Sequence, residues 1–357
     1  MQSPFRGVLL SPVRAIVLSV LAALLAAFVP LPPDLVERWY SRGIYPVLQH
    51  VLTPASSLIP IALLDLSVAG GLVAWLVFVV RRWRARGRTA GLAAAGRSLV
   101  IAASVLYLVF FAFWGINYRR ATLESKLAYD PSRVTRDATI RFAETAIDRL
   151  NALGASMPPV PSADRHALES GFERAQQRIG PARTAVPASP KRSMFSWYLR
   201  TAGIDGMMNP IFLEIILNPD ILAVERPFSL AHEWAHLAGY ANESEANFVA
   251  WLTCLEGDTA AQYSGWIEAF RYAVAALPRN ERRALTERLS PRVLADMRAI
   301  NERLGRADPA VSGFARNVYD SYLRAQGVEE GIASYGAMLR LMLGTSFENG
   351  WVPRMRN

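Results

Sequence analysis

Two of the four histidines in the chain, His232 and His236, are four residues apart, and Glu233 directly follows the first. On a helix, positions i and i+4 share one face, so both imidazoles can reach a single ion. Neutral imidazole is a favoured zinc ligand, and two imidazoles leave room for a third ligand and a water molecule. Glu233 would lie beside the ion, where a general base for that water must be.

The residues around the two histidines favour a real site over a chance pattern. Leu230, Trp234 and Leu237 are among the apolar residues that make this stretch a mostly buried helix. Two histidines and a carboxylate would be costly there without a partner. Gly239 can end the helix, as glycine often does at a C-terminus. We therefore predict a zinc site.

The third ligand should come from the next helix, where Glu243 and Glu245 compete. Asn242 is a good N-cap, and Glu245 lies three residues after it, which is an Asn variant of the capping box. That structural role for Glu245 leaves Glu243 for the metal. Asn247 lies four residues after Glu243 on the same helix face, and we expect it to hydrogen-bond a ligand histidine.

Three nearly uncharged stretches in the first third of the chain, 15–33, 57–80 and 98–118, are each about long enough to cross a bilayer. The hydrophobic fraction of 52% supports a membrane protein. The first stretch could instead be a cleaved signal peptide, because Arg6 and Arg14 precede it. Asp65 falls inside the second stretch, and we expect it at a wet interfacial position.

Arginines predict the orientation of these spans. The loop between the second and third spans contains Arg81, Arg82, Arg84, Arg86, Arg88 and Arg97. The loop between the first two spans has only Arg38 and Arg42. Since positive loops stay in the cytoplasm, the N-terminus should be cytoplasmic and everything after Tyr118 extracytoplasmic.

Charge and cysteine content exclude other classes of protein. Residues 1–120 contain 12 arginines and three acidic residues, and this difference of nine equals the net charge of the whole chain, +9. The remainder is therefore neutral, which argues against nucleic-acid binding. The single cysteine, Cys254, rules out an internal disulfide framework and is most simply a buried core thiol.

The expected organisation is mainly α. A membrane domain of three helices (1–120) precedes an extracytoplasmic domain (121–357) with a small sheet. Residues 211–218 are the best strand candidate there, either an edge strand that pairs with an extended substrate or a plain buried strand. Tyr319, Tyr322 and Tyr335 are polar groups in the last two expected helices. Their hydroxyls either stabilise a transition state near the zinc or are satisfied within the core.

The stretch 229–255 resembles the gluzincin zinc peptidases, which carry His-Glu-x-x-His and a glutamate ligand on a following helix, often written Glu-x-x-x-Asp. Here the second motif reads Glu243 to Asn247, with Asn in place of Asp. More closely, the chain resembles an uncharacterised bacterial family with three N-terminal spans and a zincin-like α+β metallopeptidase domain. That likeness rests on residues 232–248, 318–323 (VYDSYL) and 331–335 (GIASY). It implies an architecture and no substrate.

The leading hypothesis is a membrane-anchored zinc metallopeptidase acting on a peptide or protein substrate, with Zn²⁺ held by His232, His236 and Glu243. A second hypothesis is a zinc-bearing sensor or structural protein without turnover, although such a protein has no use for Glu233. A third is an intramembrane protease. The acidic residues that follow the motif, such as Glu243 and Glu256, argue against a bilayer location.

The six-arginine loop yields a topology prediction. A reporter that is active only outside the cytoplasm should be active when fused after Asn357 and silent when inserted near Arg88. The positive-inside rule is the physical reason. The opposite pair of results would reverse the orientation and remove the extracytoplasmic assignment.

Overall fold

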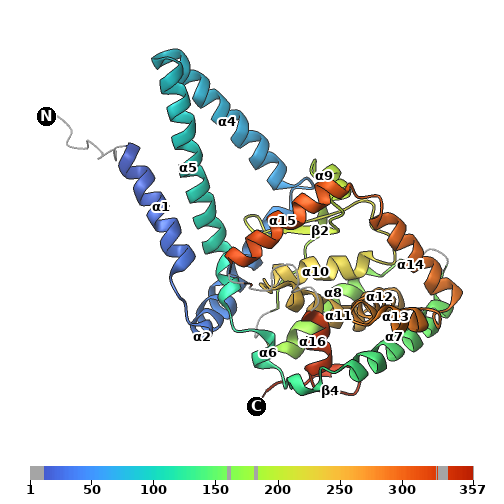
Figure 1. Cartoon of the computed structure of the whole chain (residues 1–357). Helices are drawn as coiled ribbons and strands as arrows, with labels where there is room; N and C mark the ends of the chain where they lie inside the picture. Colours follow the sequence, from blue (N-terminus) through green and yellow to red (C-terminus); the bar gives the residue numbers. More distant parts are fainter. Residues whose placement is uncertain (1–11, 159–161, 181–183, 327, 329–336, 357) are drawn as a thin grey trace.

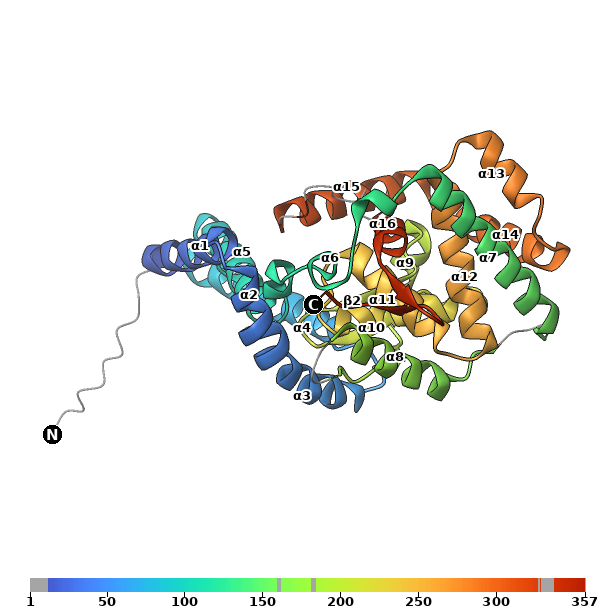
Figure 2. The same cartoon turned by 90° about the horizontal axis from the view of Figure 1, so that it is seen from below.

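The computed structural model describes residues 12–158, 162–180, 184–326, 328 and 337–356. It is mainly helical with small sheets, as predicted. Figure 1 shows long helices projecting from one side of a globular body that contains most of the remaining chain. Figure 2, seen from below, shows the same helices gathered beside and behind the body.

The projecting helices are α1 (Pro12–Phe28), α4 (Leu63–Arg86) and α5 (Arg88–Phe113). Gly87 joins α4 to α5, so these two form a hairpin whose lengths and apolar compositions suffice to cross a membrane. The first predicted span qualifies only when α1 is counted with the helical segment Pro33–Ser57, to which it is bent by 101°. The described chain thus offers two spans, or three if the bent pair is one.

The segment between α1 and α4 lies on the globular body. It contains α2 (Pro33–Leu35), the π-helix η1 (Val36–Ile44) and α3 (Tyr45–Ser57). The side chain of Gln49 donates to the carbonyl of Val186 at 2.7 Å and accepts from the amide of the same residue at 2.9 Å. Thr53 donates to the carbonyl of Leu213 at 3.2 Å. Contacts between the two predicted domains therefore extend well upstream of residue 120.

A three-stranded sheet lies beside this segment, in the order β1-β3-β2. The central strand β3 (Glu214–Leu217) is parallel to β1 (Pro190–Lys191) and antiparallel to β2 (Gly206–Asn209). All four residues of β3 are buried. The predicted strand 211–218 is thus shorter and central. Of the two alternatives for it, the plain buried strand is confirmed and the substrate-binding edge is wrong, because neighbours occupy both its sides. The second sheet pairs β4 (Phe347–Glu348) with β5 (Val352–Pro353).

Helices α10 (Arg226–Leu237) and α11 (Glu243–Leu255) pack together at the centre of the body. Around them lie α7 (Arg136–Ser156), α8 (Arg165–Ile179), α12 (Thr259–Ala275) and α16 (Ala337–Gly344). The other helices are η2 (Gly115–Arg119), α6 (Leu123–Lys126), η3 (Pro131–Arg133), α9 (Ser196–Ala202), α13 (Arg279–Thr286), α14 (Pro291–Leu304) and α15 (Pro309–Ala325). Part of the helix expected over 329–343 lies outside the described residues.

An aromatic cluster holds α11 against its neighbours. The ring of Trp251 lies 5.8 Å from that of Trp266 and 5.4 Å from that of Trp351, measured between centroids. Cys254, one turn further on, is fully buried, and burial raises the pKa of its thiol well above the ordinary value. The thiol is therefore a core group, as predicted, because a nucleophile needs the thiolate form.

The start of α4 is fixed by a carboxylate of the sheet. Glu214 is fully buried, and its two oxygens accept from the amides of Leu63 and Leu64 at 2.9 Å each. The ammonium group of Lys191 lies 2.8 Å from the same carboxylate, with 4% of its side chain exposed. Glu214 thus satisfies amide groups that no carbonyl within α4 can reach.

Asp65, in the first turn of α4, also belongs to the body. It is 9% exposed, and its carboxylate accepts from the hydroxyl of Ser193 at 2.8 Å and the amide of Met194 at 2.6 Å. Asp65 does lie at the end of α4, as expected, but it is buried against the body rather than wet. These bonds, together with the carboxylate of Glu214, explain why α4 begins at Leu63 rather than near residue 57.

The buried pair predicts a stability difference. Lys191→Met should lower the free energy of unfolding by roughly 3–5 kcal/mol, because it leaves the Glu214 charge buried without its cation. Arg283→Met is the matched control, since Arg283 forms an ion pair with Glu287 that is 82% and 62% exposed and should matter little. Denaturant midpoints of the full chain in detergent would measure both. Equal midpoints for the two variants would contradict the prediction.

Candidate metal centre

A short turn joins α10, which carries the two histidines, to α11, which begins at Glu243. Gly239 has φ +82°, a left-handed conformation that suits glycine at a helix end. A Cβ atom there would also meet the side-chain oxygen of Asn117 at 3.0 Å. Three residues later, the side chain of Asn242 accepts from the amide of Ser244 at 3.1 Å and so caps α11. Both predicted helix boundaries are confirmed.

His232, His236 and Glu243 come together, and each offers an atom within 4.8 Å of the others'. The Nε2 atoms of the two histidines are 3.1 Å apart. The Glu243 oxygens lie 3.3 Å from Nε2 of His232 (Oε2) and 3.6 Å from Nε2 of His236 (Oε1). Zinc bonds of ~2.1 Å in a tetrahedron place neighbouring ligand atoms roughly 3.4 Å apart. The spacing of this cluster therefore fits a single zinc ion.

The hydrogen bonds of the cluster also fit a bound zinc ion. Nδ1 of His236 lies 2.8 Å from the carbonyl oxygen of Tyr240. A carbonyl only accepts, so Nδ1 carries the proton, and the lone pair of a neutral ring is on Nε2, which faces the cluster. Oε2 of Glu243 is buried without a hydrogen-bond partner among the described residues. A buried anionic oxygen of this kind is costly unless a cation neutralises it.

The electrostatics of the cluster suit a cation. Burial disfavours the charged form of His236, yet the Glu243 carboxylate outweighs burial and raises the pKa of His236 to about 9. Burial opposes ionisation of Glu243 as well, but the two histidines hold the pKa of Glu243 well below its ordinary value. Without an ion, the proton on His236 is thus the counter-charge of the Glu243 carboxylate, and a bound metal ion would have to displace that proton to reach the neutral ring.

Glu233 lies beside the cluster and next to strand β2. It is 4% exposed, and burial raises the pKa of its carboxyl group. A Cβ atom at Gly206 would lie only 2.8 Å from Oε1 of Glu233, so β2 approaches this carboxylate closely because residue 206 is glycine. The sequence contained no local signal for this contact, because Gly206 and Glu233 are far apart in the chain.

Helix α15 brings a tyrosine to the cluster. The hydroxyl of Tyr319 donates to Oε1 of Glu243, and its ring stacks on that of Tyr322 at 5.9 Å. One of the tyrosines singled out in the sequence therefore contacts a predicted ligand. Tyr335, another of them, lies outside the described residues.

Asn247 is not placed as expected. It is buried on α11, but its amide donates to the hydroxyl of Tyr272 at 3.2 Å. In the described part of the chain, its hydrogen bond goes to this tyrosine and not to a ligand histidine, which corrects the prediction. Tyr272 comes from α12, and its position depends on how that helix packs, which the sequence pattern did not reveal.

Glu245 points away from the cluster. Its Oε1 accepts from the amide of Leu123 at 2.6 Å, and Arg120 and Lys126 are close enough to act on its charge. The expected capping box is therefore wrong, although Asn242 is the N-cap. Glu245 still has a structural role, because it joins α11 to the chain just beyond the α4–α5 hairpin.

The carbonyl groups at the end of α10 receive donors from upstream segments. The indole of Trp114 donates to the carbonyl of His236 at 3.0 Å, and the hydroxyl of Tyr45 to that of Leu237 at 2.9 Å. Arg120 donates to the carbonyl of Gly239 at 3.1 Å. Sequence reasoning missed these three residues, because each is separated from its acceptor by more than 100 positions.

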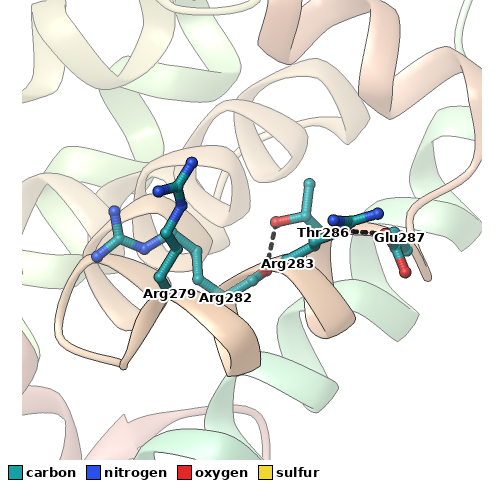
Figure 3. A pocket seen from close by; sticks show the side chains of 5 residues that line it. All are labelled: Arg279, Arg282, Arg283, Thr286 and Glu287. Atoms are coloured by element: carbon teal, nitrogen blue, oxygen red, sulfur yellow. Dashed lines mark hydrogen bonds and ion pairs between the residues drawn. The ribbon is translucent and has the colours of Figure 1, made fainter.

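A surface hollow of about 500 Å³ lies elsewhere, on α13. Figure 3 shows the side chains that line it, which include three arginines. Arg282 donates to the carbonyl of Val274 at 3.0 Å, and Arg283 pairs with Glu287 at 2.7 Å. No cluster residue lines the hollow, and two of its arginines already have partners, so it is not the candidate site.

Over residues 40–343, the chain matches the family described as "Protein of unknown function (DUF3810)". The chain belongs to this family. The DUF3810 match begins in η1 and includes α4, α5 and the cluster of His232, His236 and Glu243, so one family model covers both the hairpin and most of the body. No match was found among curated proteins or among solved structures.

The choice of third ligand can be tested by metal content. Glu243→Gln should lose most of the bound zinc, because a neutral amide is a poor zinc ligand. Glu245→Gln should retain it, since the amide oxygen can still accept from Leu123. Zinc per chain, measured by atomic spectroscopy on equally folded full-length proteins, decides between them. Reversed losses would make Glu245 the ligand.

Proposed function

We propose that this DUF3810 chain is a membrane-anchored zinc metallopeptidase. The observation that carries the proposal is the cluster of His232, His236 and Glu243, with ligand atoms 3.1–3.6 Å apart and Glu233 beside it on the same helix. A structural zinc site is usually closed by four protein ligands, whereas three ligands leave a position for water. The neighbouring carboxylate of Glu233 could then act as the general base for that water.

The residues divide the chemistry between binding and proton transfer. His232, His236 and Glu243 would hold the ion, which supplies Lewis acidity and makes water a stronger nucleophile. Glu233 accepts the proton of the attacking water and passes it to the leaving amine. The hydroxyl of Tyr319 donates to Glu243 and would have to turn away from that carboxylate to donate to the oxygen that becomes negative during attack.

Strand β2 suits an extended substrate. It pairs with β3 on one side and forms an edge of the three-stranded sheet. Gly206 places this strand next to Glu233. A peptide that adds to the outer edge of β2 would form main-chain hydrogen bonds and lie near the base. This role, expected for residues 211–218, therefore passes to β2.

The alternatives have less support. A sensor or structural zinc protein does not require Glu233 or its close approach by β2. An intramembrane protease would have the two histidines on a span, but α10 is not among the described helices long and apolar enough to cross a membrane. Its residues pack within the body instead.

Two substitutions separate a peptidase from a structural zinc protein. Glu233→Gln should keep zinc near one per chain and lower peptide hydrolysis ~10²–10⁴-fold, because it removes only the base. His232→Ala should lose both zinc and activity. The assay is cleavage of a peptide library by the full chain in detergent, with and without a chelator. A wild-type protein that binds zinc but cleaves no peptide, and a Glu233→Gln strain with normal phenotype, would refute the peptidase.

A further inference from the structure

The side of the body from which α4 and α5 project carries exposed apolar side chains. On and before α9, Met194 is 56% and Trp197 62% exposed. On α15, Phe314 is 69% and Val318 52% exposed, and Leu58, just before α4, is 85% exposed. Scattered single apolar residues are normal on a soluble surface, but large ones gathered on one side indicate an interaction site.

The α9 part of this surface adjoins the base of α4. The amide of Ala62 donates to the carbonyl of Arg192 at 2.9 Å. Two residues later, the amide of Met194 donates to Asp65 in the first turn of α4 at 2.6 Å. Met194 therefore lies level with the start of α4, and Trp197 lies in the first turn of the adjoining helix.

The α15 part adjoins the base of α5. The ring of Tyr322 lies 6.1 Å from that of Phe110, in the last turn of α5, and 6.0 Å from that of Tyr118. Toward its other end, α15 packs against α9. Figure 1 shows α15 crossing the body beneath the α4–α5 hairpin, transverse to both helices.

The two faces of α15 differ in what they contact. Phe314 and Val318 are four residues apart and point outward together. On the opposite face, Leu323 is fully buried and Tyr319 reaches Glu243. A helix with an outward apolar face that lies transverse to adjoining membrane helices has the geometry of an interfacial helix.

We propose that the surface formed by Leu58, Met194, Trp197, Phe314 and Val318 is inserted into the headgroup–acyl boundary of the bilayer that α4 and α5 cross. The surface continues directly from the ends of those helices, so lipid is the partner already present there. Tryptophan is enriched at this depth of a membrane. The cluster of His232, His236 and Glu243 then lies under a helix that contacts lipid. Resting on the peptidase function proposed above, its substrates would be chains held at the membrane surface.

Spin labels can measure this contact in the full chain reconstituted into phospholipid vesicles. Trp197→Cys and Val318→Cys introduce label sites on the surface, and Ala284→Cys on α13 is an exposed control away from it. The native Cys254 is fully buried and should not react. Collision rates of each nitroxide with oxygen, which concentrates in lipid, and with a water-soluble nickel chelate report its depth.

Labels at positions 197 and 318 should collide more with oxygen and several-fold less with nickel than the label at 284. Nickel collision rates at either position equal to those of the control would overturn the proposal. The result does not depend on zinc or on hydrolysis, since the same measurement can be repeated in Glu233→Gln. Failure here would therefore leave the proposed peptidase chemistry standing, and failure of the peptidase assay would leave this contact standing.

Discussion

The last carbonyl groups of α10 have no partners within the helix, and this constraint connects the two parts of the molecule. A helix leaves its final carbonyls to be satisfied from outside. Here Tyr45 and Trp114 donate to the carbonyls of Leu237 and His236, and Arg120 donates to that of Gly239 in the turn that follows. One acceptor is the carbonyl of His236 itself, so a predicted ligand is fixed through its own backbone. The orientation of the cluster thus depends on the segments that flank the α4–α5 hairpin.

The opposite side of the cluster is fixed from α11 and α15. Glu243 begins α11, directly after its N-cap, so the cap determines where the carboxylate lies. Tyr319 then contacts that carboxylate from α15. His236 and Glu243 are therefore each held by an element other than their own helix, whereas Nδ1 of His232 is buried without a hydrogen-bond partner among the described residues. In metal proteins, such support keeps ligand atoms at the distances that an ion requires.

The sequence was informative where the signal is local. The spacing of His232 and His236, the cap at Asn242 and the helix end at Gly239 depend on residues within a few positions, and the structure reproduces the expected geometry. The sequence was uninformative where long-range packing determines the contacts of a side chain. Glu245 matched a capping box, yet its carboxylate accepts from the backbone amide of Leu123, in a distant segment, and not from that of Asn242. A local pattern cannot show that a distant donor will bind the carboxylate.

The predictions for Asp65 and for the strand near residue 214 are incomplete for the same reason. Nothing near Asp65 in the sequence reveals that Ser193 and Met194 bind it. The apolar run 211–218 identified a buried strand but not its neighbours, and β1 and β2 come from segments with little strand character. The candidate metal ligands could be chosen from one stretch of chain, whereas the arrangement around them could not be predicted.

The donors to α10 have a consequence for biogenesis. Tyr45 and Trp114 bracket the α4–α5 hairpin in sequence, and both precede α10 by more than 100 residues. Both donors are therefore synthesised before the carbonyls that accept from them. The last turn of α10 can take its final position only after the segments on either side of the hairpin have been made. A truncated chain that began after Trp114 would leave the carbonyls of His236 and Leu237 without these two donors.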